Sequence, residues 1–296
     1  MSRAPLSVGN LLVIGLGLIG GSLVAALRKN GVEGRFSAWN RNLSTLEYAL
    51  SQGLIDEIPV SLEQAVSQAD IIVVGVPTLA VGDVFEVIAA NAKPDVIVTD
   101  AASVKGSVID AAAQAFGHIP PNFVPGHPIA GSEQSGVEAS KADLYVNHRV
   151  ILTPLANTSE QALATVQSMW QACGAQVVSM DVETHDRVLA LTSHLPHLLA
   201  FGLVDTLAKQ NDSDDIFRFA AGGFRDFTRI ASSDVTMWRD ICLANREALL
   251  DALDLFQSGL LDLRQAISDL DADALTRCFS DARSARQNFL KLLEPL

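Results

Sequence analysis

The first half of the chain alternates short apolar runs with longer segments in which apolar and polar residues repeat at helical spacing. Buried strands are expected at 11–14, 35–39, 71–76, 96–100, 123–124, 150–152 and 176–179, and helices at 18–29, 43–52, 79–92 and 163–173. Strands that alternate with helices indicate a parallel sheet covered on both faces. The pattern therefore predicts an α/β fold, a Rossmann-type doubly wound sheet, over residues 1–180.

The pattern changes after about residue 180. Residues 182–209 are helical in composition and interrupted at Pro196, and residues 234–294 place apolar side chains at three- and four-residue steps. We therefore expect an all-helical C-terminal domain, residues 181–296. Its long apolar faces are hard to bury within one small domain, which favours helices shared across a homodimer over a self-contained bundle.

The apolar stretch 11–27 resembles a signal peptide at first sight. It contains Gly15, Gly17, Gly20 and Gly21, and only Arg3 is basic before it. These features predict a strand, a turn and a helix instead. No other stretch is expected to be long and apolar enough to span a bilayer. Three widely spaced cysteines, Cys173, Cys242 and Cys278, are typical of isolated thiols in a reducing compartment, so we expect a cytoplasmic protein.

The composition and net charge indicate which kinds of binding partner the protein can have. The 296 residues include 49% hydrophobic and 19% charged residues, so a sizeable core can form, and the net charge is −13. An acidic surface repels phosphate backbones, which argues against nucleic-acid and anionic-membrane partners. An anionic substrate is still compatible with a cleft in which Arg and His side chains gather. No spacing of His, Cys or Asp predicts a metal site.

Gly15-Leu16-Gly17-Leu18-Ile19-Gly20 fits the G-x-G-x-x-G pattern between a predicted strand and a predicted helix. The first glycine allows the tight turn, the second lets the backbone approach a pyrophosphate, and the third lets helix and strand pack closely. This context indicates a dinucleotide-binding site in the first domain. The alternative is a glycine-rich turn that binds nothing.

The end of the second strand bears on the choice of cofactor. Many NAD sites carry Asp or Glu there to bind the ribose 2′-hydroxyl, whereas this chain has Asn40 followed by Arg41. A guanidinium suits a 2′-phosphate, which favours NADP. If Arg41 only stacks on the adenine, NAD is also accepted. Val76-Pro77-Thr78, at the end of the third strand, is expected to lie beside the cofactor.

Four clusters remain once the fold is assigned. They are Asp100-Ala101-Ala102-Ser103-Val104-Lys105, Gly126-His127-Pro128-Ile129-Ala130-Gly131-Ser132-Glu133, Ser193-His194-Leu195-Pro196-His197 and Gly222-Gly223-Phe224-Arg225-Asp226-Phe227-Thr228-Arg229. With the glycine loop they closely resemble the prephenate and arogenate (cyclohexadienyl) dehydrogenases, from about residue 11 to about 250. The resemblance implies oxidative decarboxylation of prephenate, arogenate or both, to 4-hydroxyphenylpyruvate or tyrosine.

Hydride removal from an alcohol carbon needs a base for the hydroxyl proton, and histidine titrates near working pH. His127 is expected in a loop between Gly126 and Pro128, and the resemblance places the catalytic base there; a surface turn histidine is the alternative. By resemblance, Ser103 hydrogen-bonds the same hydroxyl or orients His127, and it is also expected to contact the cofactor. Its alternative is a helix N-cap before Val104. Lys105 is expected to be solvated.

A substrate with two carboxylates needs cations. The resemblance implies that Arg229 binds the ring carboxylate and that His197 binds substrate, and His194 lies one turn earlier on the same helical face. By resemblance, Glu133 and Asp226 are ion-pair partners of Arg229. The alternatives are an ordinary surface ion pair for Arg229, structural roles for the two histidines, and solvated surface charges for Glu133 and Asp226.

Trp238 is expected either to close the site from a neighbouring subunit or to fill the core. For the other histidines, His118, His148 and His185, the sequence gives no pattern that predicts a role.

Two other functions fit parts of the pattern. A 3-hydroxyacid dehydrogenase relies on a lysine near the start of the helical domain, but residues 175–190 offer only His185 and Arg187 as basic groups. A nucleotide-sensing regulator that binds NADP has no need of a base at His127. We expect no regulatory domain after the helices, so any inhibition by tyrosine is expected at the active site, as a product analogue. No residue that would read the keto or amino group of the substrate is identifiable, so dual specificity is expected.

Overall fold

The computed structural model describes residues 6–131 and 134–293. The chain forms two compact units, Met1–Arg246 and Glu247–Leu296. All residues of the site described below belong to the first unit. The domain boundary expected at residue 180 lies inside that unit and stays a prediction about sequence organisation.

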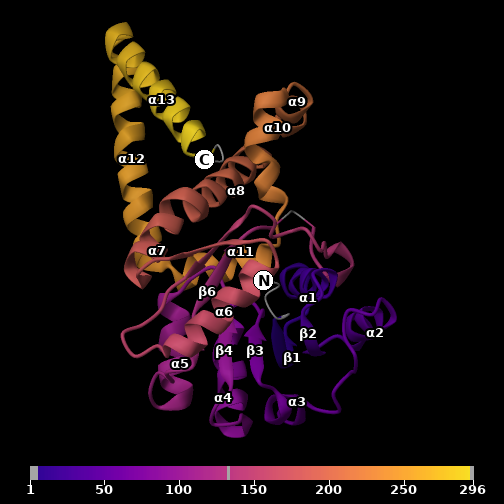
Figure 1. Cartoon of the computed structure of the whole chain (residues 1–296). Coiled ribbons are helices and arrows are strands. Elements are labelled where there is room, and N and C mark those ends of the chain that lie inside the picture. The colour runs from indigo at the N-terminus through magenta and orange to yellow at the C-terminus, as the bar shows by residue number, and fades with distance from the viewer. Residues whose placement is uncertain (1–5, 132–133, 294–296) are drawn as a thin grey trace. The chain divides into compact units, whose positions relative to one another are not determined.

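A five-stranded parallel sheet forms the centre of the first unit (Figure 1). Its strands are β1 (Ser7–Ile14), β2 (Glu33–Trp39), β3 (Ile71–Val74), β4 (Ile97–Asp100) and β5 (Phe123–Val124), in the order β2-β1-β3-β4-β5. The α/β, doubly wound prediction is confirmed. In this order the direction of winding reverses between β1 and β3, and the ligand crevice of such sheets lies at the carboxyl ends of those two strands.

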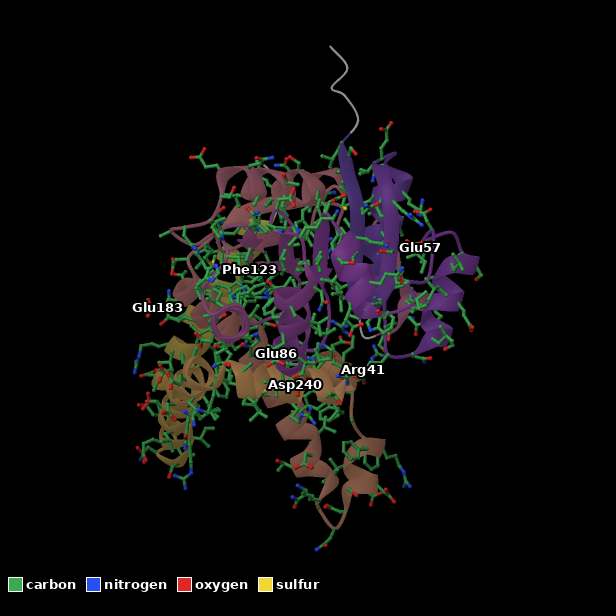
Figure 2. All side chains as sticks on the ribbon, turned by 90° about the horizontal axis from the view of Figure 1, so that it is seen from below. Arg41, Glu57, Glu86, Phe123, Glu183 and Asp240 are labelled. Atoms are coloured by element: carbon green, nitrogen blue, oxygen red, sulfur yellow. The ribbon has the colours of Figure 1, made fainter. Side chains whose placement is uncertain are left out.

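Helices cover both faces of this sheet, as predicted. They are α1 (Leu18–Lys29), α2 (Leu43–Ser51), α3 (Leu62–Gln68), η1 (Thr78–Ala80), α4 (Val81–Asn91), α5 (Gly106–Phe116) and α6 (Glu160–Ala172). Alternate residues of β1 serve the two cores: Leu11 and Val13 pack with α1 and α6, whereas Leu12 and Ile14 pack with α3, α4 and α5. Phe123 is buried, whereas Glu86 and Glu183 are exposed (Figure 2).

A second, three-stranded sheet contains β6 (Gly126–Ile129), β7 (Arg149–Leu152) and β8 (Gln176–Ser179), with β6 antiparallel to β7 and β7 parallel to β8. The expectation that the strands near 150 and 176 extend the parallel sheet was therefore wrong. So was the loop expected around His127, which lies in β6. Gly126 and Pro128 suggested a turn, but β6 is an edge strand, where the missing N–H of a proline is tolerated.

The helices of the second half begin with α7 (Val182–Leu189), a π-helical turn η3 (Ala190–His194) and α8 (Leu195–Ala208). They continue with α9 (Ser213–Arg218), α10 (Gly222–Thr228), η4 (Arg229–Ser232), α11 (Val235–Ala244), α12 (Arg246–Ser268) and α13 (Ala272–Leu293). Pro196 does not break the helix. A proline lacks an N–H and crowds the carbonyl four residues earlier, and the wider π turn just before it absorbs both effects.

The helical run Val182–Ala208 is long and apolar enough, by length and composition, to cross a membrane. By this measure the expectation that no stretch beyond 11–27 reaches that length was wrong. A single helix of this kind is weak evidence for a membrane span, because helices of soluble proteins pass the same test. This run also carries His185, His194 and His197, which take part in the polar contacts described next.

Candidate active site

The glycine loop has the geometry that the three glycine roles require. Gly15 has a φ of +91°, and a Cβ there would lie 2.7 Å from the backbone of Gly75. A Cβ on Gly20 would lie 2.7 Å from Val13 Cγ1, whereas one on Gly17 would meet nothing within 4 Å. The first and third glycines therefore serve packing within the protein. The open space at Gly17, the residue that caps α1, is where a pyrophosphate can approach the backbone.

This difference between the glycines gives a testable prediction. Gly17→Ala is expected to keep the free energy of unfolding within about 1 kcal/mol, because its backbone angles suit alanine and the new methyl group meets no atom. The same methyl group is expected to weaken cofactor binding at least about tenfold, by occupying the space of the pyrophosphate. Cofactor titration by fluorescence and urea unfolding measure the two effects. Equal loss of stability in Gly17→Ala and Gly15→Ala would contradict the assignment.

The carboxyl ends of β1, β3 and β4 lie side by side. Gly75 N–H donates to the Ile14 carbonyl at 2.7 Å, and Ala101 N–H donates to the Val74 carbonyl at 2.9 Å. This register brings together the glycine loop, the Val76-Pro77-Thr78 segment and the loop that carries Ser103. Thr78 opens η1, which packs against α11.

Asn40 ties the end of β2 to the glycine loop. Its Nδ2 donates to the Leu16 carbonyl at 3.2 Å, and its Oδ1 accepts the Asn42 N–H at 3.1 Å. The side chain of Arg41 is exposed beside it. The loop thus presents a neutral amide and a guanidinium, with no carboxylate at the position that commonly binds a ribose 2′-hydroxyl.

Lys105 is fully buried, so the expectation that it is solvated was wrong. It pairs with the equally buried Asp100, and its Nζ donates to the Gly126 carbonyl at 2.6 Å. Asp100 Oδ1 accepts the Gly126 N–H at 3.1 Å. The pair therefore holds both backbone groups of Gly126, the residue before His127. Burial lowers the pKa of Lys105, while the charge of Asp100 opposes that shift.

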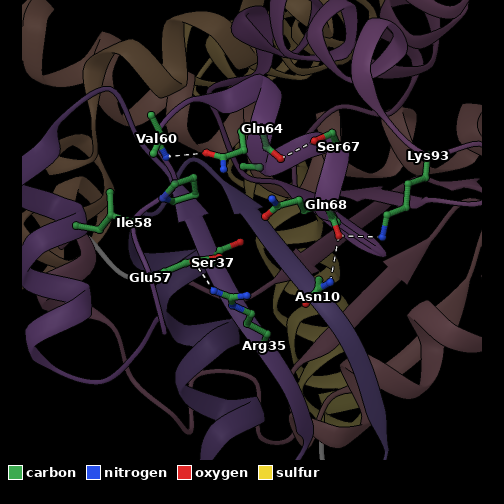
Figure 3. A pocket seen from close by; sticks show the side chains of 13 residues that line it. Asn10, Arg35, Ser37, Glu57, Ile58, Val60, Gln64, Ser67, Gln68 and Lys93 are labelled. Carbon is green, nitrogen blue, oxygen red and sulfur yellow. Dashed lines mark hydrogen bonds and ion pairs between the residues drawn. The ribbon is translucent and has the colours of Figure 1, made fainter.

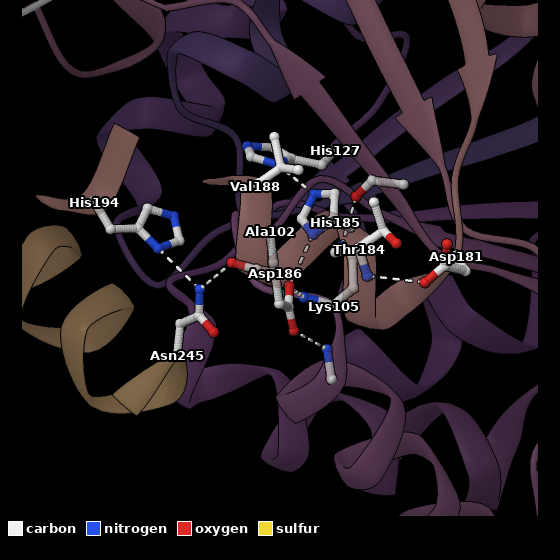
Figure 4. Close-up of polar contacts among 12 residues, drawn as sticks. Ala102, Lys105, His127, Asp181, Thr184, His185, Asp186, Val188, His194 and Asn245 are labelled. Atoms are coloured by element: carbon white, nitrogen blue, oxygen red, sulfur yellow. Dashed lines mark hydrogen bonds and ion pairs between the residues drawn. The ribbon is translucent and has the colours of Figure 1, made fainter. Parts of the chain in front are cut away.

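His127 is buried, with 9% of its surface exposed. Its Nδ1 lies 2.9 Å from Nε2 of His185, and His185 Nδ1 lies 2.8 Å from Asp186 Oδ1 (Figure 4). Burial, and then the nearby His185, Lys105 and His194, lower the pKa of His127 well below its ordinary value. The imidazole is therefore neutral at physiological pH, the state that a general base requires.

Sequence reasoning missed His185 and Asp186. A weak indication was present: Asp181 caps α7 by accepting the Thr184 N–H at 2.8 Å, and the helix begins at Val182. His185 and Leu189, one turn apart, are both buried on the same face. Helical spacing could thus have placed His185 inside the protein, but no local pattern showed that its partner is 58 residues away.

Ser103 lies in the loop after β4 and is half-buried. Helix α5 begins at Gly106, with Lys105 at the N-cap position and no side-chain cap, so the alternative that Ser103 caps this helix was wrong. The expected roles of Ser103 toward His127, the substrate hydroxyl and the cofactor stay predictions.

His194 is buried, and Asn245 contacts one of its two ring nitrogens. Asn245 Nδ2 lies 3.0 Å from His194 Nδ1 and donates to the Asp186 carbonyl at 2.8 Å. Because that carbonyl can only accept, the amide nitrogen faces His194, and His194 Nδ1 must accept. Nε2 then carries the proton, and among the described residues it has no hydrogen-bond partner. Burial lowers the pKa of His194 to about 4, so the ring is a neutral donor.

His197 stacks on Trp238, with ring centroids 3.5 Å apart and an angle of 16° between the planes. Its Nδ1 donates to the Ser193 carbonyl at 2.9 Å. Trp238 lies in α11 of the same chain and is 8% exposed, and it also contacts His194 edge-on. Both expected substrate-binding histidines therefore meet at one tryptophan.

The remaining predicted residues are Arg229, Asp226 and Glu133. Arg229 begins η4, which packs against α8, and its side chain is exposed. The Asp226 carboxylate lies 3.6 Å from Arg225 Nε, and both side chains are exposed. Glu133 lies outside the described residues. The expected ion-pair set around Arg229 stays a prediction.

A cavity of about 410 Å³ lies at the opposite end of the sheet (Figure 3). Its walls include Asn10 and Arg35, from the amino-terminal parts of β1 and β2. Its cations are already engaged: Arg35 pairs with Glu57, and Lys93 pairs with Asp70 at 2.6 Å. The cavity is therefore separate from the glycine loop and the histidines.

Comparisons with known proteins show which family the chain belongs to. The family model described as "Prephenate dehydrogenase, nucleotide-binding domain" matches residues 23–179, and "Prephenate dehydrogenase, dimerization domain" matches residues 181–281. A cyclohexadienyl dehydrogenase of Zymomonas mobilis is 39% identical over 94% of this chain and 94% of its own, and a prephenate dehydrogenase of Bacillus subtilis is 37% identical over 93% and 75%.

Among solved structures, prephenate dehydrogenase from Aquifex aeolicus in complex with hydroxyphenyl propionate and NAD+ is similar at a TM-score of 0.90 and 36% identity, over 96% of this chain and 99% of that one. Arogenate dehydrogenase from Synechocystis is similar at a TM-score of 0.79 and 30% identity, over 95% and 99%. The protein therefore belongs to the prephenate dehydrogenase family and is an NAD(P)-dependent dehydrogenase.

Proposed function

We propose that the protein oxidatively decarboxylates both prephenate and arogenate in tyrosine biosynthesis, with His127 as the general base. The observation that carries this proposal is the buried imidazole of His127, which is neutral because its pKa is lowered and whose Nδ1 lies 2.9 Å from His185 Nε2. We assign its other ring nitrogen, Nε2, to the substrate. The identity to cyclohexadienyl and prephenate dehydrogenases supports the same reaction.

In the proposed reaction, His127 takes a proton from the substrate and later returns it. A bound nicotinamide supplies the hydride acceptor. As hydride leaves C4 of the ring, His127 Nε2 accepts the proton of the C4 hydroxyl, and that carbon becomes a carbonyl. The bond to the ring carboxylate then breaks, its electron pair enters the ring, and carbon dioxide leaves. The resulting phenolate oxygen recovers the proton from His127, so no net proton is consumed.

Three side chains on the helices can donate hydrogen bonds to the substrate carboxylates. His194 Nε2–H is a buried neutral donor, His197 lies on Trp238 one turn further along the helix, and Arg229 lies on an element packed against α8. We propose that these three residues bind the ring and side-chain carboxylates, with Arg229 suited to a bidentate pair. Tyrosine shares the side chain of arogenate, and we propose that it inhibits in competition with substrate.

For the cofactor, we propose a preference for NADP over NAD, supported by the neutral Asn40 and the exposed Arg41. Asn40→Asp is expected to lower kcat/KM with NADP relative to NAD at least about 100-fold. The added carboxylate can bind a 2′-hydroxyl but repels a 2′-phosphate. Steady-state kinetics with both cofactors measure this ratio. A ratio that stays unchanged would show that Asn40 does not face the ribose.

We propose that the protein is a cytoplasmic homodimer. Helix α12 exposes the apolar side chains of Leu250, Leu255, Leu260 and Leu261 within the single chain, and the matched family model is described as a dimerization domain. Cys173, Cys242 and Cys278 are free thiols, which suits a reducing compartment. Sedimentation of the purified protein tests the oligomeric state.

The deciding experiment is a spectrophotometric assay of the purified protein with prephenate or arogenate, each with NAD or NADP. Substrate-dependent cofactor reduction with both substrates supports the proposal. The ratios of kcat/KM among the four mixtures then give the substrate and cofactor preference. Reduction with one substrate only would refute dual specificity. Cofactor binding with no reduction in any mixture would refute the dehydrogenase function and favour a nucleotide sensor.

A further inference from the structure

We infer that Asp186, acting through His185, is a positioning device that holds His127 in the tautomer whose Nε2 bears the lone pair (Figure 4). The inference rests on the proposed role of His127 as the base and adds what makes that base competent. His185 and Asp186 are positioning residues in this scheme, since neither touches the substrate.

The chain of hydrogen bonds begins at Asp186. Its Oδ1 accepts the backbone N–H of Lys105 at 2.8 Å, and its Oδ2 accepts the backbone N–H of Gly106 at 2.8 Å, at the start of α5. Backbone N–H groups can only donate, so both carboxylate oxygens are acceptors. Burial alone would raise the pKa of Asp186, but these bonds and the one from His185 outweigh it and lower the pKa. Asp186 is therefore an anion with a fixed orientation.

The anion sets the tautomer of His185. Its Nδ1 lies 2.8 Å from Asp186 Oδ1 and must donate, because the carboxylate oxygen can only accept. A neutral His185 then has its lone pair at Nε2. That atom faces Nδ1 of His127 at 2.9 Å, so His127 Nδ1 donates and its own lone pair is left at Nε2.

The surroundings of His127 explain why the positions of the protons on the two imidazoles matter for catalysis. The ring is enclosed by His185 at a centroid distance of 5.1 Å, and Lys105 and His194 also lower its pKa, while Asp100 neutralises Lys105 from β4. Without His185, His127 Nδ1 would be buried with no acceptor in that direction. A ring with the proton on Nε2 donates to the substrate hydroxyl and cannot accept its proton.

The test uses two substitutions at one position. His185→Leu removes the acceptor and is expected to lower kcat about 100-fold, the scale of a misplaced general base, with the cofactor Kd unchanged. His185→Gln restores a carbonyl oxygen for His127 Nδ1–H and is expected to recover at least about tenfold. His148→Leu is the matched control, since that histidine is exposed. A Gln variant no more active than Leu, or full activity of His185→Leu, would overturn the inference.

A direct reading of the tautomer separates this inference from the proposed function. In the cofactor-bound protein labelled with ¹⁵N-histidine, the His127 signals are assigned by their loss in His127→Asn. We expect a protonated Nδ1 and an unprotonated Nε2 in the wild type, and a proton on Nε2 in His185→Leu. A wild type with the proton on Nε2, or no change in His185→Leu, refutes the positioning role. Absence of enzymatic activity in the wild type refutes only the proposed function, because the tautomer is measured without turnover.

Discussion

His127→Asn is expected to lower kcat by about 10²–10⁴-fold, the contribution of a positioned general base, in whichever substrate and cofactor mixture the wild type prefers. Asparagine keeps a donor for His185 but offers no group that can take a proton near neutral pH. The affinity for cofactor is expected to stay within about twofold, because the glycine loop follows β1 and Asn40 follows β2, whereas His127 lies in β6. Steady-state kinetics and cofactor titration measure both quantities.

The matched control for this substitution is His118→Asn. His118 is exposed, and its Nδ1 lies 3.1 Å from the Phe116 carbonyl. Its replacement is expected to leave kcat unchanged. If His127→Asn kept wild-type activity, another group would have to accept the hydroxyl proton, and the mechanism proposed here would be wrong.

The depressed pKa of His127 also predicts the pH dependence of the reaction. The base acts in its neutral form, so kcat/KM falls only when the pH drops through the pKa of His127. Burial, with His185, Lys105 and His194, places that pKa well below about 6.5. The kcat/KM profile is therefore expected to be flat from about pH 8 down past about 6.5, with the acid limb below that value. An acid limb centred above about 7 would contradict this environment.

Elements whose ends are set by neighbouring residues were predicted closely from the sequence. The helix at 18–29 was placed at both ends, because a glycine loop starts it and Asn30-Gly31 ends it. The parallel sheet followed from buried apolar runs, although two of the expected strands, 150–152 and 176–179, belong to the second sheet. In contrast, β6 was taken for a loop, because the pairing of Gly126 and His127 with Leu152 and Ile151 depends on residues far along the chain.

The candidate site divides in the same way. His127 and His197 lie in recognisable strings and were candidates from the sequence alone, and the structure stacks His197 on Trp238. The residues that support them were missed: Asp186 binds backbone groups 80 and 81 residues away, and Lys105 is fully buried and donates to the carbonyl of Gly126 in β6. A short polar segment looks the same in a sequence whether it is solvated or enclosed by a distant strand.

The buried Lys105–Asp100 pair is the place where one substitution is expected to cost most in stability. Lys105→Met removes the cation but leaves the fully buried Asp100, and it also takes the donor away from the Gly126 carbonyl. Loss of one partner of a buried pair typically costs about 3–5 kcal/mol, because a buried charge is left uncompensated. Urea unfolding of Lys105→Met is expected to show a loss of this size.

Two comparisons isolate that cause. Lys93→Met breaks the partly exposed pair with Asp70 and is expected to cost at most about 1 kcal/mol. The double variant Asp100→Asn/Lys105→Met no longer buries a charge, and the oxygen of the new amide can still accept the N–H of Ala102 or Gly126, so it is expected to be more stable than Lys105→Met alone. A Lys105→Met protein as stable as Lys93→Met would show that Asp100 is not an uncompensated anion there. The Lys105–Asp100 pair holds both backbone groups of Gly126, the residue before His127. If the activity of Lys105→Met falls by more than its folded fraction does, we infer that His127 is displaced.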